Sequence, residues 1–316
     1  MREEIHVQTD TIDVRLVRLR PESGPPVVYV PGLGANPRAV DLAPEPSLAQ
    51  ALHEAGRTPW AVDFRISWHR GGMCSLSLLR ALELALVELE HHSGHRAQSF
   101  GAIGHSLGGI LLLGIAARGV PLHRLVTLGT GLDYRLGHVD LKHLLRFMKV
   151  RGRLRRASQG LGGFPLTRPA RALAPIFGRE LFGRSLSLPL QLDQFHPGAT
   201  EGELIRRFFR QGVADVPFPL LLDLAGLFQE DGLRFGEADP LKEQVRHLDV
   251  PVMLVAGRQD RQCPVDSVRD AADRIPGSLL LEVGTAEPGL GYGHMDLLLG
   301  QRAATEVFPA ILKFLE

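Results

Sequence analysis

A serine with the features of a catalytic nucleophile lies about a third of the way along the chain. Ser106 lies in the sequence GHSLG, residues 104–108, between an apolar segment on each side. Small residues two positions before and after a serine permit a tight strand-to-helix turn, which projects the hydroxyl from the edge of a sheet. A serine is a weak nucleophile, so it needs a base, and the base needs an acid to orient it. The pattern favours a nucleophilic Ser106 over a merely structural turn.

The base is expected from a histidine late in the chain. His294 lies in GLGYGHMDLLLG and follows the last predicted strand across a glycine-rich loop, where it would project over the sheet edge. Taken alone it is an ordinary loop histidine, and Ser106 is what favours the catalytic role. We expect His105 to point away from the site, as neighbours on a turn do, and His69 and His138 have no supporting context.

The acid is predicted to be Asp260, in VAGRQDRQCPV, directly after a predicted strand. An acid at the carboxyl end of a strand lies on the same edge of the sheet as Ser106. Asp133 is the rival candidate and Asp266 a weaker one, whereas Asp296 is too close to His294 in sequence to be its partner. The resulting chain order is serine, acid, histidine.

The oxyanion that forms during acyl transfer needs two backbone amides. Leu107 follows the nucleophile and would supply one amide. The second is expected from Leu33 in Pro31-Gly32-Leu33-Gly34, the loop that follows an earlier buried strand, although an ordinary tight turn would favour the same glycines.

Short apolar segments alternate with helical patterns around these residues, which predicts a doubly wound, mostly parallel sheet. Expected strands are residues 12–19, 27–30, 59–64, 99–103, 125–128, 251–257 and 278–283. Expected helices are residues 47–56, 76–91, 107–118, 267–274 and 303–315. Residues 100–117 imitate a membrane span in length and hydropathy, but five glycines favour a strand, a turn and a helix.

The alternation stops after about residue 134 and resumes near residue 248. The segment between has many arginines, prolines and short apolar pieces. We therefore predict an α/β core in two parts, residues 1–133 and 248–316, with a mainly helical cap inserted at residues 134–247. Four phenylalanines of the insertion are expected to form its core, namely Phe208, Phe209, Phe218 and Phe228.

Together these motifs resemble those of α/β-hydrolase fold proteins. The sequences PGLGAN, GHSLGG, LGTGLDYR and YGHMDLLLG are similar to the lipase and polyhydroxyalkanoate-synthase-like side of that superfamily. The resemblance implies the α/β-hydrolase fold and a triad of Ser106, Asp260 and His294. Two departures matter. Pro31 stands where many members have histidine, and Ser106 stands where the synthases have cysteine, which argues against polymerisation.

Composition narrows the alternatives. With 36 basic and 35 acidic residues, the chain lacks the positive charge that favours nucleic acid as a partner. Two cysteines among 316 residues and a charged N-terminal sequence favour a cytoplasmic protein. The sequence contains no HExxH or CxxC motif, and we expect neither a metal nor a cofactor.

One segment breaks the charge balance. Residues 142–184 carry eleven basic residues and one acid, Glu180, so the remainder of the chain is net acidic. The basic residues are Lys142, Arg146, Lys149, Arg151, Arg153, Arg155, Arg156, Arg168, Arg171, Arg179 and Arg184. The segment can be a solvated surface, or it can attract an anionic membrane surface peripherally or an anionic acyl carrier.

The leading hypothesis is a serine hydrolase that cleaves small-molecule or lipid esters with apolar acyl groups through an acyl-enzyme. An acyltransferase or thioesterase using the same triad is the first alternative. A non-catalytic binding protein on the same fold is the second, and a full set of triad residues argues against it.

Overall fold

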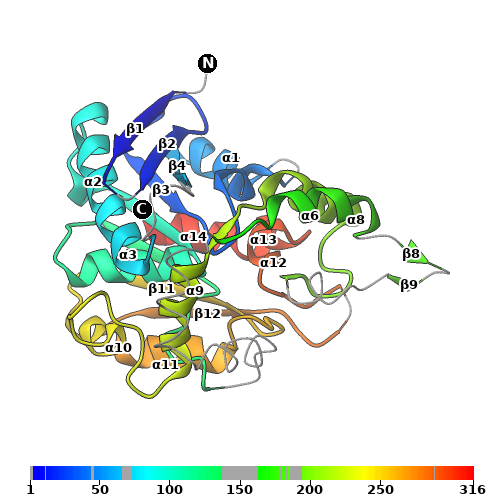
Figure 1. The fold of residues 1–316 in the computed structure, drawn as a ribbon. Coiled ribbons are helices and arrows are strands. Elements are labelled where there is room, and N and C mark those ends of the chain that lie inside the picture. Colours follow the sequence, from blue (N-terminus) through cyan, green and yellow to red (C-terminus); the bar gives the residue numbers. More distant parts are fainter. Residues whose placement is uncertain are drawn as a thin grey trace.

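The structure is a computed structural model of the chain. It describes residues 3–10, 12–43, 46–65, 73–136, 163–177, 180–181, 184–185, 194–287 and 289–316. An eight-stranded sheet forms its centre, with helices on both faces (Figure 1).

The order of strands in this sheet is β1-β2-β4-β3-β5-β6-β11-β12. The last six strands in this order run parallel to one another, and β1 and β2 complete one edge in antiparallel pairing. The eight strands are β1 (Glu4–Gln8), β2 (Asp13–Arg18), β3 (Pro26–Val30), β4 (Thr58–Arg65), β5 (Gly101–His105), β6 (Arg124–Leu128), β11 (Val252–Gly257) and β12 (Leu279–Val283). The mostly parallel sheet confirms the predicted fold class.

Side chains of the central strands alternate between two hydrophobic clusters, one on each face. In β3, Val28 and Val30 belong to one cluster, and Val27 and Tyr29 to the other. This period of two arises because successive side chains of a strand point to opposite faces. Helices α2 (Ser75–Ser93), α3 (Leu107–Ala117) and α11 (Val265–Arg274) cover the first face, and α1 (Leu48–Glu54), α12 (Asp296–Leu299) and α14 (Phe308–Leu315) cover the second.

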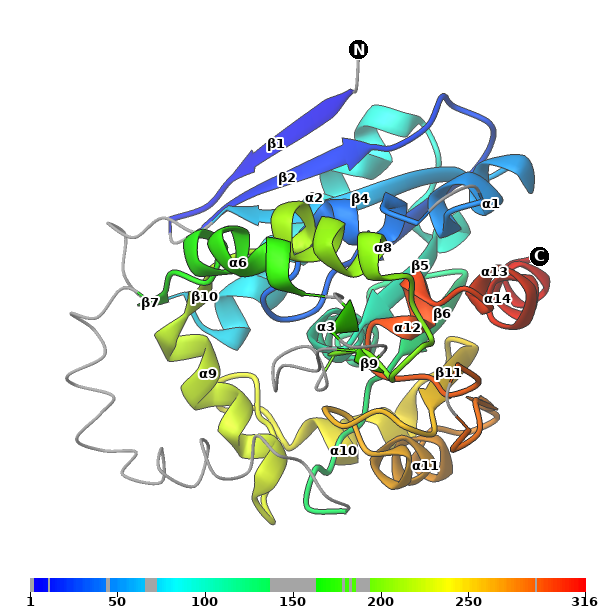
Figure 2. The same cartoon turned by 90° about the vertical axis from the view of Figure 1, so that its right-hand side faces the viewer.

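The described elements between β6 and β11 lie outside the eight-stranded sheet. They are β7 (Gly163–Phe164), α6 (Thr167–Leu173), η3 (Ala174–Ile176), β8 (Glu180–Leu181), β9 (Arg184–Ser185), α8 (Gly202–Arg207), η4 (Phe208–Gly212), β10 (Val216–Pro217), α9 (Phe218–Leu224), η5 (Ala225–Phe228), α10 (Leu241–Gln244) and η6 (Val245–His247). Helices α6 and α8 lie beside the sheet in Figure 1 and face the viewer in Figure 2. The predicted boundaries of the insertion, residues 134 and 247, stay a prediction.

Most elements fall within a few residues of their predicted ranges. Residues 100–117, which imitate a membrane span in the sequence, form β5, a turn and α3, as predicted. In the described part of the chain, no helix is long and apolar enough to cross a membrane. Two predictions need correction. Residues 4–8 form an edge strand, β1, that the sequence analysis did not identify, and the expected final helix is two helices, α13 (Ala303–Glu306) and α14. The second helix begins at Phe308, and Pro309 lies in its first turn, where the missing N–H of proline has no partner to lose.

Candidate active site

The predicted site residues follow strands that end at one edge of the sheet. Leu33 follows β3, Ser106 follows β5, Asp260 follows β11 and His294 follows β12. These strands are parallel, so their carboxyl ends meet at the same edge, which is where open α/β sheets place their ligands.

Ser106 lies on a strained turn between β5 and α3. Its φ of 54° and ψ of −116° make it the one non-glycine residue with a left-handed φ among the described residues. The neighbouring glycines make this turn possible: a Cβ at Gly104 would overlap the amide of Gly109, and a Cβ at Gly108 would overlap the carbonyl of Val30. Such strain, on the order of 1–3 kcal/mol, persists where the surrounding structure enforces it, and it is typical of functional sites. Ser106 itself is only half-buried, whereas His105 and Leu107 beside it are buried.

Asp260 and His294 form a direct, buried pair. Nδ1 of His294 donates to Oδ2 of Asp260 over 2.7 Å, and both side chains are almost fully inaccessible to solvent. The other carboxylate oxygen, Oδ1, accepts from the backbone amides of Gln262 at 2.8 Å and Cys263 at 2.9 Å. These bonds fix the carboxylate and leave Nε2 of His294 as the ring nitrogen that can exchange a proton.

The end of β6 lies between Ser106 and this pair. The Ser106 amide donates to the carbonyl of Leu128 at 2.8 Å. A Cβ at the next residue, Gly129, would lie 3.0 Å from both Asp260 Oδ2 and His294 Nδ1. Within the described part of the chain, the Ser106 hydroxyl makes no hydrogen bond to His294; such contacts are often long before substrate binds.

The rival acids are engaged elsewhere. Asp133 forms an ion pair with Arg135. Burial alone would raise the pKa of Asp133, but the hydrogen bonds and the charge of Arg135 outweigh burial and lower it. Asp266 pairs with Arg269. Asp296 accepts hydrogen bonds from the amides of Gly293 and His196 and from the Thr200 hydroxyl, none of which belongs to the His294 ring.

Two backbone amides at the site are without an acceptor among the described residues. They belong to Leu33, in the loop after β3, and to Leu107, the first residue of α3. The first amides of a helix have no partner inside the helix, and they favour negative charge. Gly32 permits the two segments to approach closely, since it has no side chain and a Cβ at this position would lie only 3.1 Å from the Cβ of Ser106.

The expectation that His105 points away from the site is wrong. Its ring centroid lies 4.5 Å from that of His294, and its Nε2 lies 3.0 Å from the carbonyl oxygen of His294. Burial, together with the nearby His294, lowers the pKa of His105 to about 3, so its ring is neutral at physiological pH. Nothing in the spacing of the sequence indicates this contact, because it joins residues 189 positions apart.

A cavity of about 230 Å³ adjoins these residues. Its core side consists of the loop 32–35, the two histidines and Met295, and its other walls come from the segment between β6 and β11. Phe208 and Phe209 line it while also being buried, so these two are both core and cavity wall. Phe228 packs elsewhere, against Tyr134.

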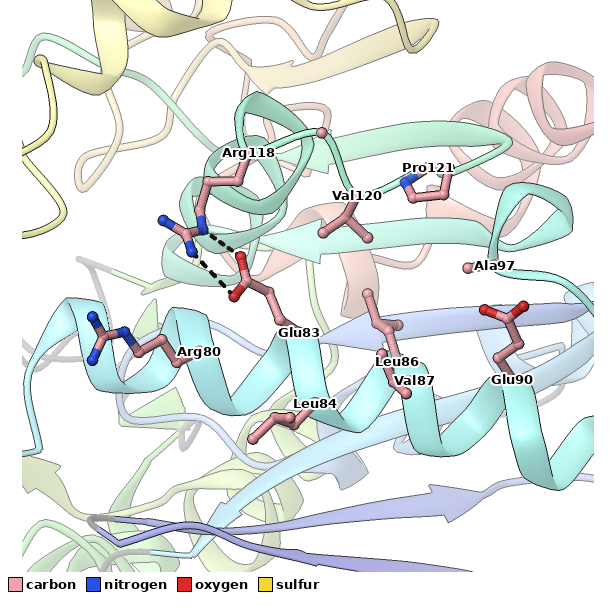
Figure 3. Close-up of a pocket in the computed structure, with 11 residues that line it drawn as sticks. Arg80, Glu83, Leu84, Leu86, Val87, Glu90, Ala97, Arg118, Val120 and Pro121 are labelled. Atoms are coloured by element: carbon pink, nitrogen blue, oxygen red, sulfur yellow. Dashed lines mark hydrogen bonds and ion pairs between the residues drawn. The ribbon is translucent and has the colours of Figure 1, made fainter.

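A larger hollow of about 620 Å³ lies away from this site, between α2 and the loop that follows α3 (Figure 3). Arg118 forms an ion pair with Glu83 at its edge, and Leu84 and Val87 are exposed beside it. None of its lining residues is serine, cysteine or histidine, so it offers no nucleophile with a base. Among the described residues, no group of three histidine, cysteine or acidic side chains could hold a metal ion.

Most of the basic segment, residues 142–184, lies outside the described residues. Arg168 and Arg171 are described, and both are exposed on α6. The Nε of Arg171 donates to the carbonyl of Arg210. The predicted contact with an anionic membrane stays a prediction.

The chain is similar in structure to several known proteins. A bromoperoxidase from Bacillus anthracis superposes with a TM-score of 0.61 at 17% identity, covering 99% of both chains. The carboxylesterase CesB from Bacillus subtilis gives 0.56 at 15% identity, over 100% of this chain and 92% of that one. A thioesterase domain from the curacin biosynthetic pathway gives 0.58 at 14% identity, over 100% and 99%. No family model and no curated protein sequence matches the chain. It has the α/β-hydrolase fold, as the sequence motifs implied.

Proposed function

We propose that the protein is a serine hydrolase that cleaves carboxylic esters through an acyl-enzyme. The observation that carries this proposal is the buried 2.7 Å hydrogen bond from His294 Nδ1 to Asp260 Oδ2, at the same sheet edge as the strained turn that holds Ser106. A histidine oriented by a carboxylate beside an accessible serine is the arrangement that activates a hydroxyl.

In the proposed first step, the Ser106 hydroxyl oxygen bonds to the ester carbonyl carbon and its proton passes to His294 Nε2. The carbonyl oxygen becomes an oxyanion, which the amides of Leu33 and Leu107 would stabilise by donating hydrogen bonds. When the tetrahedral intermediate collapses, the bond to the alcohol oxygen breaks and His294 returns its proton to that oxygen. The acyl group is then bonded to Ser106.

In the second step, water attacks the acyl-enzyme and gives its proton to His294. When the second tetrahedral intermediate collapses, the bond between the acyl carbon and Ser106 Oγ breaks, His294 returns the proton to Oγ, and the carboxylic acid is released. Asp260 holds the imidazole in one tautomer and stabilises the positive ring that forms in each step.

Two measurements test this function. Ser106→Ala should lower turnover of an activated ester on the order of a millionfold, and a fluorophosphonate probe should label the wild type but not the variant. Ser99→Ala is the matched control, because Ser99 lies just before β5, at the opposite edge of the sheet. Unchanged turnover in folded Ser106→Ala protein would contradict the assignment.

Product analysis with an added alcohol or thiol then separates hydrolysis from the acyl-transfer alternative, since a transferase gives a new ester or thioester.

A further inference from the structure

Resting on the proposed hydrolase function, we propose that the cavity beside His294 binds the acyl chain of the substrate. We further propose that it selects uncharged aliphatic chains of medium length, about nine carbon atoms. Sixteen of the described residues line the cavity. Three of its properties carry the proposal: the residues that it shares with the site, the composition of its walls, and its volume.

The cavity begins at the groups that would hold the reacting carbonyl. Leu33, the proposed oxyanion donor, lines it together with Gly32, Gly34 and Ala35. His294 lines it as well, so it reaches both the oxyanion loop and the base. A carbonyl oxygen held by the Leu33 amide would place the carbonyl carbon, and the chain attached to it, at the mouth of this cavity. We assign the cavity to the acyl chain, and the alcohol series below tests the opposite placement.

The walls that the described residues form are apolar and contain no aspartate, glutamate, lysine or arginine. Apart from the two histidines, only Gln194 among the sixteen residues is polar. Phe177 and Phe209 stack with ring centroids 3.8 Å apart, and Phe208 packs edge-on against Phe209 at 5.4 Å. Burial of an ionised group among such side chains is strongly unfavourable, whereas burial of methylenes is favourable.

The volume sets the chain length. An apolar cavity of about 150 Å³ holds the six carbon atoms of benzene, so the volume of about 230 Å³ has room for about nine carbon atoms. Acetyl esters would leave most of it empty, and a sixteen-carbon chain would extend beyond it.

The cavity walls are held to the oxyanion loop. Val213 pairs with Ala35 in an isolated β-bridge, and the Ala214 amide donates to the Gly34 carbonyl at 2.8 Å. The Asn36 side chain donates to the Gln211 carbonyl at 2.7 Å. These bonds fix one wall of the cavity relative to the Leu33 amide, which is what a selective acyl site requires.

The test is the dependence of kcat/KM on acyl length from two to sixteen carbons, with the alcohol kept constant. We expect an increase of about fourfold per methylene, a maximum near eight to ten carbons, and a decrease beyond it. An acyl chain of the same length that ends in a carboxylate should react about a hundredfold more slowly. A second series varies the alcohol at fixed acyl length and should change kcat/KM little.

A cavity-filling variant provides the structural control. Ala170→Leu adds three carbon atoms to a residue that lines the cavity, so the optimum should shift two or three carbons shorter. Ala172→Leu is matched to it, since Ala172 lies on the same helix, α6, but is exposed and outside the cavity, and its profile should equal that of the wild type. Fluorophosphonate titration of both variants reports the fraction of folded, reactive enzyme.

The outcomes separate this inference from the proposed function. Suppose the wild type is labelled at Ser106 but kcat/KM is highest for acyl chains of four carbons or fewer, or of sixteen carbons. Only the acyl-site inference is then overturned, and the same holds if kcat/KM depends on the length of the alcohol and not on that of the acyl chain. An unchanged optimum in labelled Ala170→Leu protein overturns it too. If Ser106 is not labelled and no ester is cleaved, the proposed function fails and this inference fails with it.

Discussion

The side chain of His105 contacts the main chain of His294: Nε2 of His105 lies 3.0 Å from the carbonyl oxygen of His294, and the centroids of the two rings are 4.5 Å apart. A carbonyl oxygen can only accept, so Nε2 of His105 carries the proton. Its Nδ1 is then a bare acceptor, buried and without a partner among the described residues. Because burial lowers the pKa of His105 to about 3, this arrangement does not change over the working range of pH.

This contact predicts that His105 is a positioning residue. His105→Leu removes the donor to the His294 carbonyl, which should cost about 1–3 kcal/mol of stability, and a displaced His294 ring should lower kcat by about ten- to a hundredfold with little change in KM. His105→Gln keeps an N–H at a similar reach and should restore most of kcat. Steady-state kinetics and urea unfolding of both variants check this, and equal kcat in the two variants would contradict it.

The second prediction concerns the acid. Asp260→Asn should lower kcat on the order of ten-thousandfold, because an amide at this position favours the wrong tautomer of His294. Asp133→Asn should have a small effect on kcat, since Asp133 is bound to Arg135 and not to His294. Kinetics of both variants with one ester decide between the two acids, and a larger loss in Asp133→Asn would move the acid to the end of β6.

The third prediction concerns Gly129. It separates the effect of backbone strain from the effect of a methyl group placed against the Asp260–His294 pair. Gly129 and Gly94 have φ values of +57° and +69°, so Gly129→Ala and Gly94→Ala should each lose about 1–2 kcal/mol of stability. Only at Gly129 does the added Cβ lie 3.0 Å from Asp260 and His294, whereas it meets nothing within 4 Å at Gly94. Only Gly129→Ala should therefore lose activity, by about a hundredfold. Comparable kcat in the two folded variants would show that the pair tolerates the methyl group.

The nucleophile turn could be predicted from sequence because its requirements are local. Gly104, Gly108 and Gly109 are needed within a few residues of Ser106. The structure shows that backbone atoms exclude a Cβ at Gly104 and Gly108, and that the Thr130 side chain excludes one at Gly109. The core strands could be predicted for the same reason, since a short apolar segment between turn residues has few alternatives in a parallel sheet.

The contacts across the site could not be predicted. The side-chain direction of His105 depends on a carbonyl 189 residues away. The cavity wall depends on the stacking of Phe177, which follows η3, on Phe209 of η4. Strand β1 was not identified because its sequence EIHVQ is short and polar, and only Val7 is buried. Such features are decided by tertiary packing, which overrides local preference.

The last prediction concerns the stability of the His294 loop as a function of pH. Asp296 is fully buried and accepts from the amides of Gly293 and His196 and from the Thr200 hydroxyl, which ties the loop before His294 to the chain at residues 196–200. Burial raises the pKa of Asp296 from 3.8 to about 6, so the folded protein binds this proton more tightly than the unfolded chain.

A carboxyl with a raised pKa in the folded state contributes stability that is present below about pH 4 and is lost as pH rises through about 6. The shift corresponds to about 3 kcal/mol. Asp296→Asn is neutral at every pH and keeps an oxygen that can accept from the amides, so it removes this dependence. The free energy of unfolding of the wild type minus that of Asp296→Asn should therefore fall by about 2 kcal/mol between pH 4 and 7 and stay constant above pH 7. Urea unfolding of both proteins at intervals over this range measures the difference, and a difference that is constant or rises with pH would show that Asp296 is ionised in the folded protein throughout.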